Sequence, residues 1–130
     1  MEVFSIQILK FEPSWDKALS NKDREEINAI FLETNKGSLL NVHLSPIRQV
    51  TNHRGDLLVT VLVHNFTHKE LTFKEKILVY IENEIIMAKH VFTLPSLIIQ
   101  PQVSMPWTFI FPANSLHSHL TLENGRLEIK

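Results

Sequence analysis

Apolar residues recur at two different spacings along this chain of 130 residues. In the first third they fall three to four residues apart, which is the spacing of one face of an α-helix. Beyond that point apolar and polar residues alternate, which is typical of strands with one buried face. The change of period predicts a single domain, residues 1–130, made of an N-terminal segment at 1–37 and a β region at 38–130.

The N-terminal segment predicts a short strand within Val3–Phe11 and then two helical stretches. Ser14 suits an N-cap, so one or two helical turns are expected over 15–19. A second helix is expected from Ser20 or Asn21, closed by the Lys36-Gly37 pair. One face of that helix carries Ile27, Ile30, Phe31 and Thr34.

The β region divides into alternating segments separated by turn residues. These segments are 40–44, ending before Pro46, then 57–65, 71–73, 77–81, 85–92 and an aromatic segment at 107–111. Helices do not alternate with them, which favours antiparallel over parallel pairing. The pattern predicts a mainly β fold, an immunoglobulin-like antiparallel sandwich of about seven strands with an N-terminal helical segment.

The aromatic segment begins at Pro106, and Trp107, Phe109 and Phe111 follow at period two. In an extended chain all three rings point to one face. Trp107 could anchor a partner if it were exposed, since Trp is common at binding hot spots. Three exposed aromatic rings would form an adhesive patch, so we interpret this face as core.

The last residues contain Asn124-Gly125, the preferred pair for a type I′ hairpin turn. Pairing outward from that turn would place three residue pairs opposite one another. These pairs are Glu123 with Arg126, Leu122 with Leu127, and Leu120 with Ile129. The sequence therefore predicts a C-terminal hairpin.

Composition narrows the class of protein further. The 13 basic and 14 acidic residues give a net charge of -1, so no overall field favours nucleic acid. Cysteine is absent, which removes disulfides and thiolate metal sites. The first residues do not form a signal peptide and no apolar run could span a bilayer, so we expect a cytoplasmic protein without membrane insertion.

The order of these features resembles the SLAP domain, a small domain of spore-forming Gram-positive bacteria named from accessory Sec system S-layer assembly proteins. The matching segments are 11–19, 55–61, 78–80, 90–94 and 104–111. The most specific of them is Pro-Trp-Thr-Phe at 106–109. The family's S-layer assembly proteins carry the domain as a tandem pair, whereas this chain has one copy of the motif. The resemblance implies a role linked to S-layer assembly or accessory secretion and provides no catalytic residue.

The side chains with the clearest potential for chemistry are the seven histidines. His117 and His119 would share a face if extended, and with His90, His64 or Glu123 they could hold a transition metal. Histidines beside turns are more often solvated or hydrogen-bonded surface residues, which is the interpretation we favour. A small cytosolic metal- or ligand-binding protein is the alternative function.

Arrangements typical of enzymes are missing from the sequence. No Ser lies in a strand-to-helix elbow, and 3 glycines leave little backbone to cradle a phosphate. The acidic runs Glu25-Glu26 and Glu82-Asn83-Glu84 are interpreted as solvated helix and turn charges. We therefore expect no enzyme and no cofactor.

The remaining candidates are surfaces for another protein chain. The helix face at Ile27, Ile30 and Phe31 must be buried against the sandwich or against another chain. An unpaired sheet edge could also accept a strand from a partner. The sequence thus predicts a non-enzymatic protein-interaction or assembly module that binds protein partners or itself.

Overall fold

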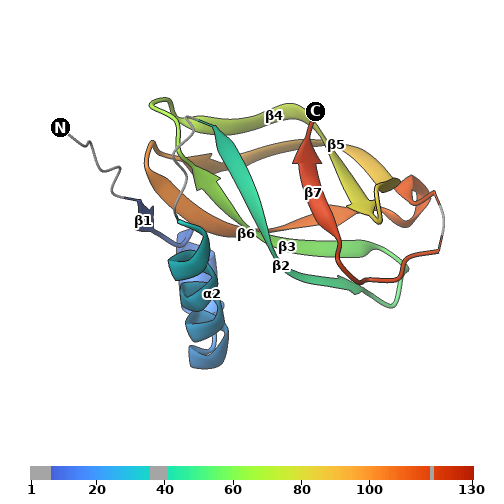
Figure 1. The fold of residues 1–130 in the computed structure, drawn as a ribbon, viewed down its shortest axis with the longest axis horizontal. Helices are drawn as coiled ribbons and strands as arrows, with labels where there is room; N and C mark the ends of the chain where they lie inside the picture. Colours follow the sequence, from blue (N-terminus) through green and yellow to red (C-terminus); the bar gives the residue numbers. More distant parts are fainter. Residues whose placement is uncertain (1–6, 36–40, 118) are drawn as a thin grey trace.

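The computed structural model describes residues 7–35, 41–117 and 119–130. Within them seven strands form two sheets (Figure 1). The four-stranded sheet has the order β1-β6-β3-β2, with β1 parallel to β6 and the other pairs antiparallel. The three-stranded sheet has the order β5-β4-β7 and is antiparallel throughout. The mainly β, two-layer fold expected from the alternation is confirmed.

The elements have the following bounds. They are β1 (Ile8–Leu9), α1 (Pro13–Ala18), α2 (Asn21–Thr34), β2 (Val42–Thr51), β3 (Leu57–Asn65), β4 (Leu71–Glu82), β5 (Ile85–Ile99), β6 (Val103–Phe111), a 3₁₀ turn at Ala113–Ser115, and β7 (Arg126–Ile129).

The main core lies between the two sheets because each strand directs alternate apolar residues inward. Strand β3 contributes Val59, Val61 and Val63, all with no exposed surface. Strand β4 contributes Leu78 and Tyr80, which are also fully buried. The period-two pattern of the sequence therefore corresponds to the inner faces of a sandwich.

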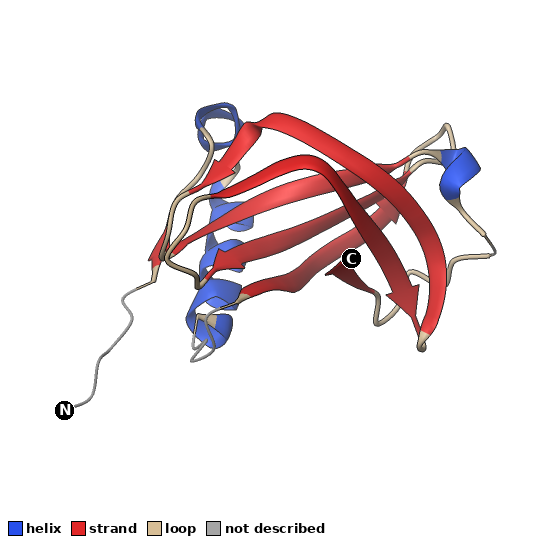
Figure 2. Ribbon diagram, turned by 90° about the horizontal axis from the view of Figure 1, so that it is seen from above, coloured by secondary structure: helices blue, strands red, loops and turns tan. Residues whose placement is uncertain are grey.

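The outer face of the four-stranded sheet is covered by α2 (Figures 1 and 2). Ser20 caps this helix, since its hydroxyl accepts a hydrogen bond from the Asp23 amide at 3.0 Å. The cap of α1 is Glu12 rather than Ser14, because Pro13 takes the first helical position and leaves the Ser14 amide to bond the Glu12 carboxylate. The predicted cap of α1 was thus misplaced by two residues.

Strand β2 does not end before Pro46, as predicted, but continues to Thr51. Proline is tolerated there because, among the described strands, β2 pairs with β3 alone and forms an edge, so one side of its backbone needs no ladder hydrogen bonds. A register shift between Pro46 and Arg48 marks a bulge at this point. The segments at 71–73 and 77–81 likewise join into one strand, β4, which is bent at a bulge between Phe73 and Lys76.

The predicted C-terminal hairpin is wrong. Residues 126–129 form β7, which pairs with Leu78–Ile81 of β4, and residues 120–123 form no strand. Pairing with β4 buries Leu127 in the main core, which a two-stranded hairpin on the surface could not do. Gly125 directly precedes β7 and lies against the ring of Tyr80. A Cβ added at position 125 would overlap the phenol group of that ring.

Candidate binding groove

The helix face predicted as an interaction surface is buried within the chain itself. Ile27 and Phe31 retain 3% and 8% exposure, and they pack with Leu62 of β3 on the outer face of the four-stranded sheet. Ile30 is partly buried against the same cluster. The helix therefore packs on its own sandwich through Ile27 and Phe31, while Ile30 keeps part of its surface exposed.

Two of the three aromatic rings of β6 lie in the main core between the sheets. Phe109 and Phe111 have no exposed surface, and the ring of Phe92 packs edge-on against both, at centroid distances of 5.3 and 5.2 Å. Trp107 is partly buried against this core and stacks on Trp15 of α1 at 6.2 Å. Pro106 is buried as well. Trp107 thus joins the main core to the helical segment.

The paired histidines His117 and His119 are exposed and lie after the 3₁₀ turn. Ser118 between them lies outside the described residues. Across the described part of the chain, no group of three or more His, Cys, Asp or Glu side chains is arranged to hold a metal ion.

His64 differs from the other histidines because it is fully buried beneath α2. Its Nδ1 lies 2.6 Å from the Ser104 hydroxyl, and its Nε2 lies 2.7 Å from the Thr34 hydroxyl. Burial, with a smaller effect from nearby His43, lowers the pKa of His64 to about 4. The Ser–His contact resembles a nucleophile and base, but Ser104 is also fully buried, so a substrate cannot reach it.

A second buried polar cluster surrounds Glu82, which sequence analysis interpreted as a solvated turn charge. Glu82 is only 2% exposed, and it accepts hydrogen bonds from the Tyr80 hydroxyl, the Thr121 amide and hydroxyl, and the Leu122 amide at 2.6–3.1 Å. Burial alone would raise the pKa of Glu82, but these donors outweigh it and hold that pKa below the usual carboxyl value. The carboxylate therefore fixes residues 121–122 against β4.

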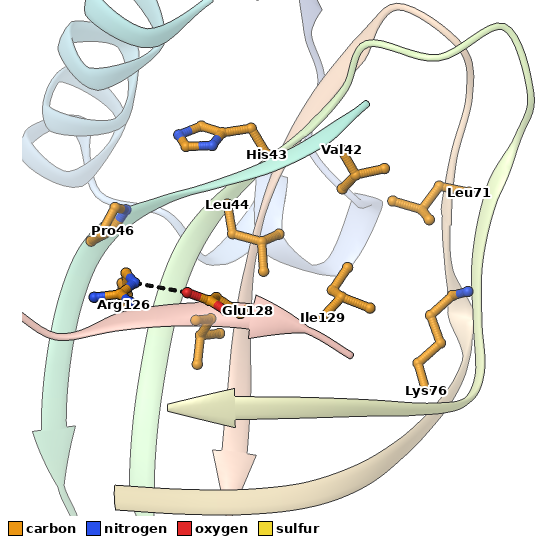
Figure 3. Close-up of a pocket in the computed structure, with 10 residues that line it drawn as sticks. Val42, His43, Leu44, Pro46, Leu71, Lys76, Arg126, Glu128 and Ile129 are labelled. Carbon is orange, nitrogen blue, oxygen red and sulfur yellow. Dashed lines mark hydrogen bonds and ion pairs between the residues drawn. The ribbon is translucent and has the colours of Figure 1, made fainter. Parts of the chain in front are cut away.

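A hollow of about 710 Å³ lies where the edge of the four-stranded sheet approaches β7 (Figure 3). We name it the β2–β7 groove. Its apolar residues are Val42, Leu44, Leu71, Leu127 and Ile129. Its other lining residues are His43, Pro46, Lys76, Arg126 and Glu128. A mostly apolar hollow with a few polar groups has the composition of a binding site.

The two basic side chains that line the groove differ in their ion pairs. Arg126 bonds Glu84 and Glu128, each at 2.9 Å, and these bonds raise the pKa of Arg126 and lower the pKa values of both carboxyls. Lys76, on β4 near the other end of the groove, has no ion-pair partner within the described ranges (Figure 3). Counting the described side chains, the groove therefore carries one uncompensated positive charge, at its Lys76 end.

Sequence analysis missed the groove because it is assembled from three distant segments, 42–46, 71–76 and 126–129. The only signal in the sequence was indirect. Pro46 within an alternating segment indicates an edge strand, and an edge strand borders the open side of a sandwich. Which other segments face that edge depends on the topology.

Two β-sheets packed face to face, with a helical segment covering one of them, define a small β-sandwich domain. A family model described as the SLAP domain matches residues 9–129, nearly the whole chain. The chain therefore belongs to the SLAP domain family, and the resemblance drawn from the Pro-Trp-Thr-Phe motif is confirmed.

No curated protein and no solved structure matches the chain. In the described ranges, neither α-helix combines the length and the hydropathy needed to cross a bilayer.

Proposed function

We propose that this domain is a non-enzymatic protein-interaction or assembly module that binds its partner through the β2–β7 groove, in S-layer assembly or accessory secretion. The observation that carries the proposal is the groove itself, an apolar hollow bordered by the edges of two sheets. Covering apolar surface of this kind favours association, and strand edges are common sites of protein association. Membership of the SLAP domain family supports the cellular setting.

The buried ionisable groups support a non-catalytic role. Both ring nitrogens of His64 contact hydroxyl groups of the fold, and both carboxylate oxygens of Glu82 accept hydrogen bonds from it. Neither side chain lines the groove. Their shifted pKa values therefore have a structural cause, and we assign them to stability rather than to acid–base chemistry.

The proposal places the module on the cytoplasmic side of the secretion apparatus. A chain with no cysteine needs no oxidising compartment to fold. A domain of this size buries enough surface to be stable without disulfides.

The test is crosslinking of the tagged protein in its native cells, followed by isolation of its partners. The groove variant is Ile129→Asp, and the matched control is Val91→Asp, on β5 outside the groove where the side chain is 51% exposed. We expect a partner that is recovered with the wild type and the control but lost with the groove variant. That partner should then bind the purified wild-type domain directly.

Circular dichroism and the melting temperature establish that both variants are folded before partners are compared. Equal recovery of the same partner with Ile129→Asp would refute the groove as the binding surface. Recovery of no specific partner with the wild type would remove the proposed function as a whole.

A further inference from the structure

The Asn124-Gly125 pair lies in a stretch of chain that no strand pairing holds in place. Strand β7 begins only at Arg126, and residues 119–125 belong to no helix or strand. Asn124 is exposed, and its φ of 53° lies in the left-handed region that asparagine tolerates better than most residues. Among the described residues, neither the Asn124 side chain nor the Gly125 amide has a hydrogen-bond partner. The two groups are therefore free to react with each other.

An asparagine followed by glycine contains both reactants of an intramolecular reaction, which is one reason why asparagine is thermolabile. The Gly125 nitrogen loses its proton to hydroxide and bonds to the Asn124 Cγ, while the side-chain nitrogen takes up a proton and leaves as ammonia. Water then opens the cyclic succinimide at either carbonyl. Opening at Cγ gives aspartate, and opening at the main-chain carbonyl gives isoaspartate, whose backbone runs through Cγ. The net change consumes one water and releases one ammonia.

The structure distinguishes Asn124 from two other exposed asparagines. Asn83 also has a left-handed backbone, with a φ of 50°, but the residue after it is Glu84, whose Cβ crowds the attacking nitrogen. Asn114 is followed by Ser115, whose amide already bonds a backbone carbonyl at 2.8 Å. Asn124 thus combines an unhindered neighbour with an unbonded amide, and each of the other two lacks one of these features.

The reaction would change the chain at the point where β7 begins. Gly125 lies so close to the Tyr80 ring that not even a Cβ fits between them. Isoaspartate lengthens the backbone by a carbon atom directly before this contact, so Gly125 and the first residues of β7 must shift along β4. We therefore expect weaker pairing of β7, which also forms one wall of the β2–β7 groove.

We propose that Asn124 is a site of spontaneous covalent modification, at which the folded protein converts to isoaspartate and aspartate with loss of ammonia. The isoaspartate form has a loosened β7. The modification goes beyond the proposed function and does not depend on which partner the module binds.

The first test is peptide mapping by mass spectrometry after incubation of the full purified chain at mildly alkaline pH. Asn124 should convert at least about tenfold faster than Asn83 or Asn114, because it alone of the three precedes an unhindered and unbonded amide. A parallel incubation in urea gives the rates of the unfolded chain. Conversion of Asn124 in urea but not in the folded chain, or in neither, would overturn the proposal.

Carboxyl methylation by an isoaspartate methyltransferase separates the two products, since aspartate is not its substrate. Asn124→Gln should abolish the methylation, because the longer side chain disfavours ring closure. Asn83→Gln, at an exposed position in the β4–β5 turn, is the matched control and should leave the methylation unchanged. Aspartate without isoaspartate, or methylation that survives Asn124→Gln, would contradict the assignment.

Hydrogen exchange on the isolated isoaspartate form tests the effect on β7. Exchange at residues 126–129 should accelerate at least about tenfold relative to the unmodified chain. Freshly purified Asn124→Asp adds the charge without lengthening the backbone, and its exchange should stay close to that of the wild type. Unchanged exchange in the isoaspartate form, or an equal acceleration in Asn124→Asp, would refute the loosening by a longer backbone.

Discussion

His64 shows how one buried side chain links three separate segments of the chain. It lies on β3, contacts Ser104 on β6 and Thr34 at the end of α2, and stacks against Phe66 at 5.1 Å. Its neutral form fits this site, because a second ring proton would bring a charge into a fully buried position. Its protonation therefore couples folding to pH.

We predict that the free energy of unfolding decreases as the pH falls from 6.5 to about 4. The pKa of His64 is lower in the folded protein, so below pH 6.5 the unfolded chain binds the proton more readily and the folded state loses stability. The gap from 6.5 to about 4 corresponds to a loss of up to about 3 kcal/mol. Urea unfolding at a series of pH values measures it.

His64→Gln should flatten this pH dependence above pH 5, where the acidic groups with lowered pKa values remain charged. The exposed His68→Gln is the matched control and should preserve the wild-type slope. A slope that survives His64→Gln would show that another group is responsible.

Among the elements, the residues just before β7, 121–122, are held by a side chain rather than by strand pairing. Residues 121–122 bond the Glu82 carboxylate, and this contact replaces the hairpin that the Asn124-Gly125 pair predicts. Local turn preference could not reveal this arrangement, because Glu82 is about 40 residues away along the chain. The pairing of β7 with β4 and the hydrogen bonds of the buried Glu82 carboxylate together stabilise the chain more than the hairpin turn would.

We predict that Glu82→Gln lowers the free energy of unfolding by about 2 kcal/mol, because a buried carboxylate with several donors loses its charge-assisted hydrogen bonds. Hydrogen exchange should accelerate at Thr121 and Leu122. Glu84→Gln, at an exposed position in the same turn, should cost much less, because its ion pair with Arg126 is screened by solvent. Equal losses for the two variants would contradict the role assigned to Glu82.

The elements that the sequence predicted well are those whose signal is local. The start of α2 at Asn21, the helix face at Ile27 and Phe31, and the inward face of β3 each follow from residues close together in the chain. The short strand expected at Val3–Phe11 is represented by Ile8–Leu9, while its first part lies outside the described residues, as does the Lys36-Gly37 helix end. Strand lengths and partners were harder to predict, because they depend on contacts between distant segments.

The sheets of the molecule end in edge strands, and such edges can pair with the same edges of other copies of the protein. Among the described strands β5 pairs with β4 alone, and its other edge carries one isolated bridge, between Ala88 and Leu116. Pro95 lies in this edge, where β5 carries extra residues between Leu94 and Ile98 relative to β4. A proline and a bulge in an edge strand both oppose edge-to-edge association.

We predict that Pro95→Thr raises the self-association constant about fivefold, the effect expected from about 1 kcal/mol of restored backbone hydrogen bonding. Sedimentation velocity over a range of protein concentrations measures it. Ser96→Thr changes the neighbouring exposed residue without adding an N–H and should leave the wild-type behaviour unchanged. An identical response of the two variants would exclude the proline as the protecting feature.

The close approach of Gly125 to Tyr80 has a consequence for how sequences of this family can diverge. A side chain at position 125 would overlap the aromatic ring at position 80, so position 125 can vary only where position 80 carries a smaller residue. A shorter residue at position 80 would leave room for a Cβ at position 125, and the two substitutions made together should be better tolerated than the second one alone. Among relatives, a bulky ring at the first position should therefore be accompanied by a glycine at the second.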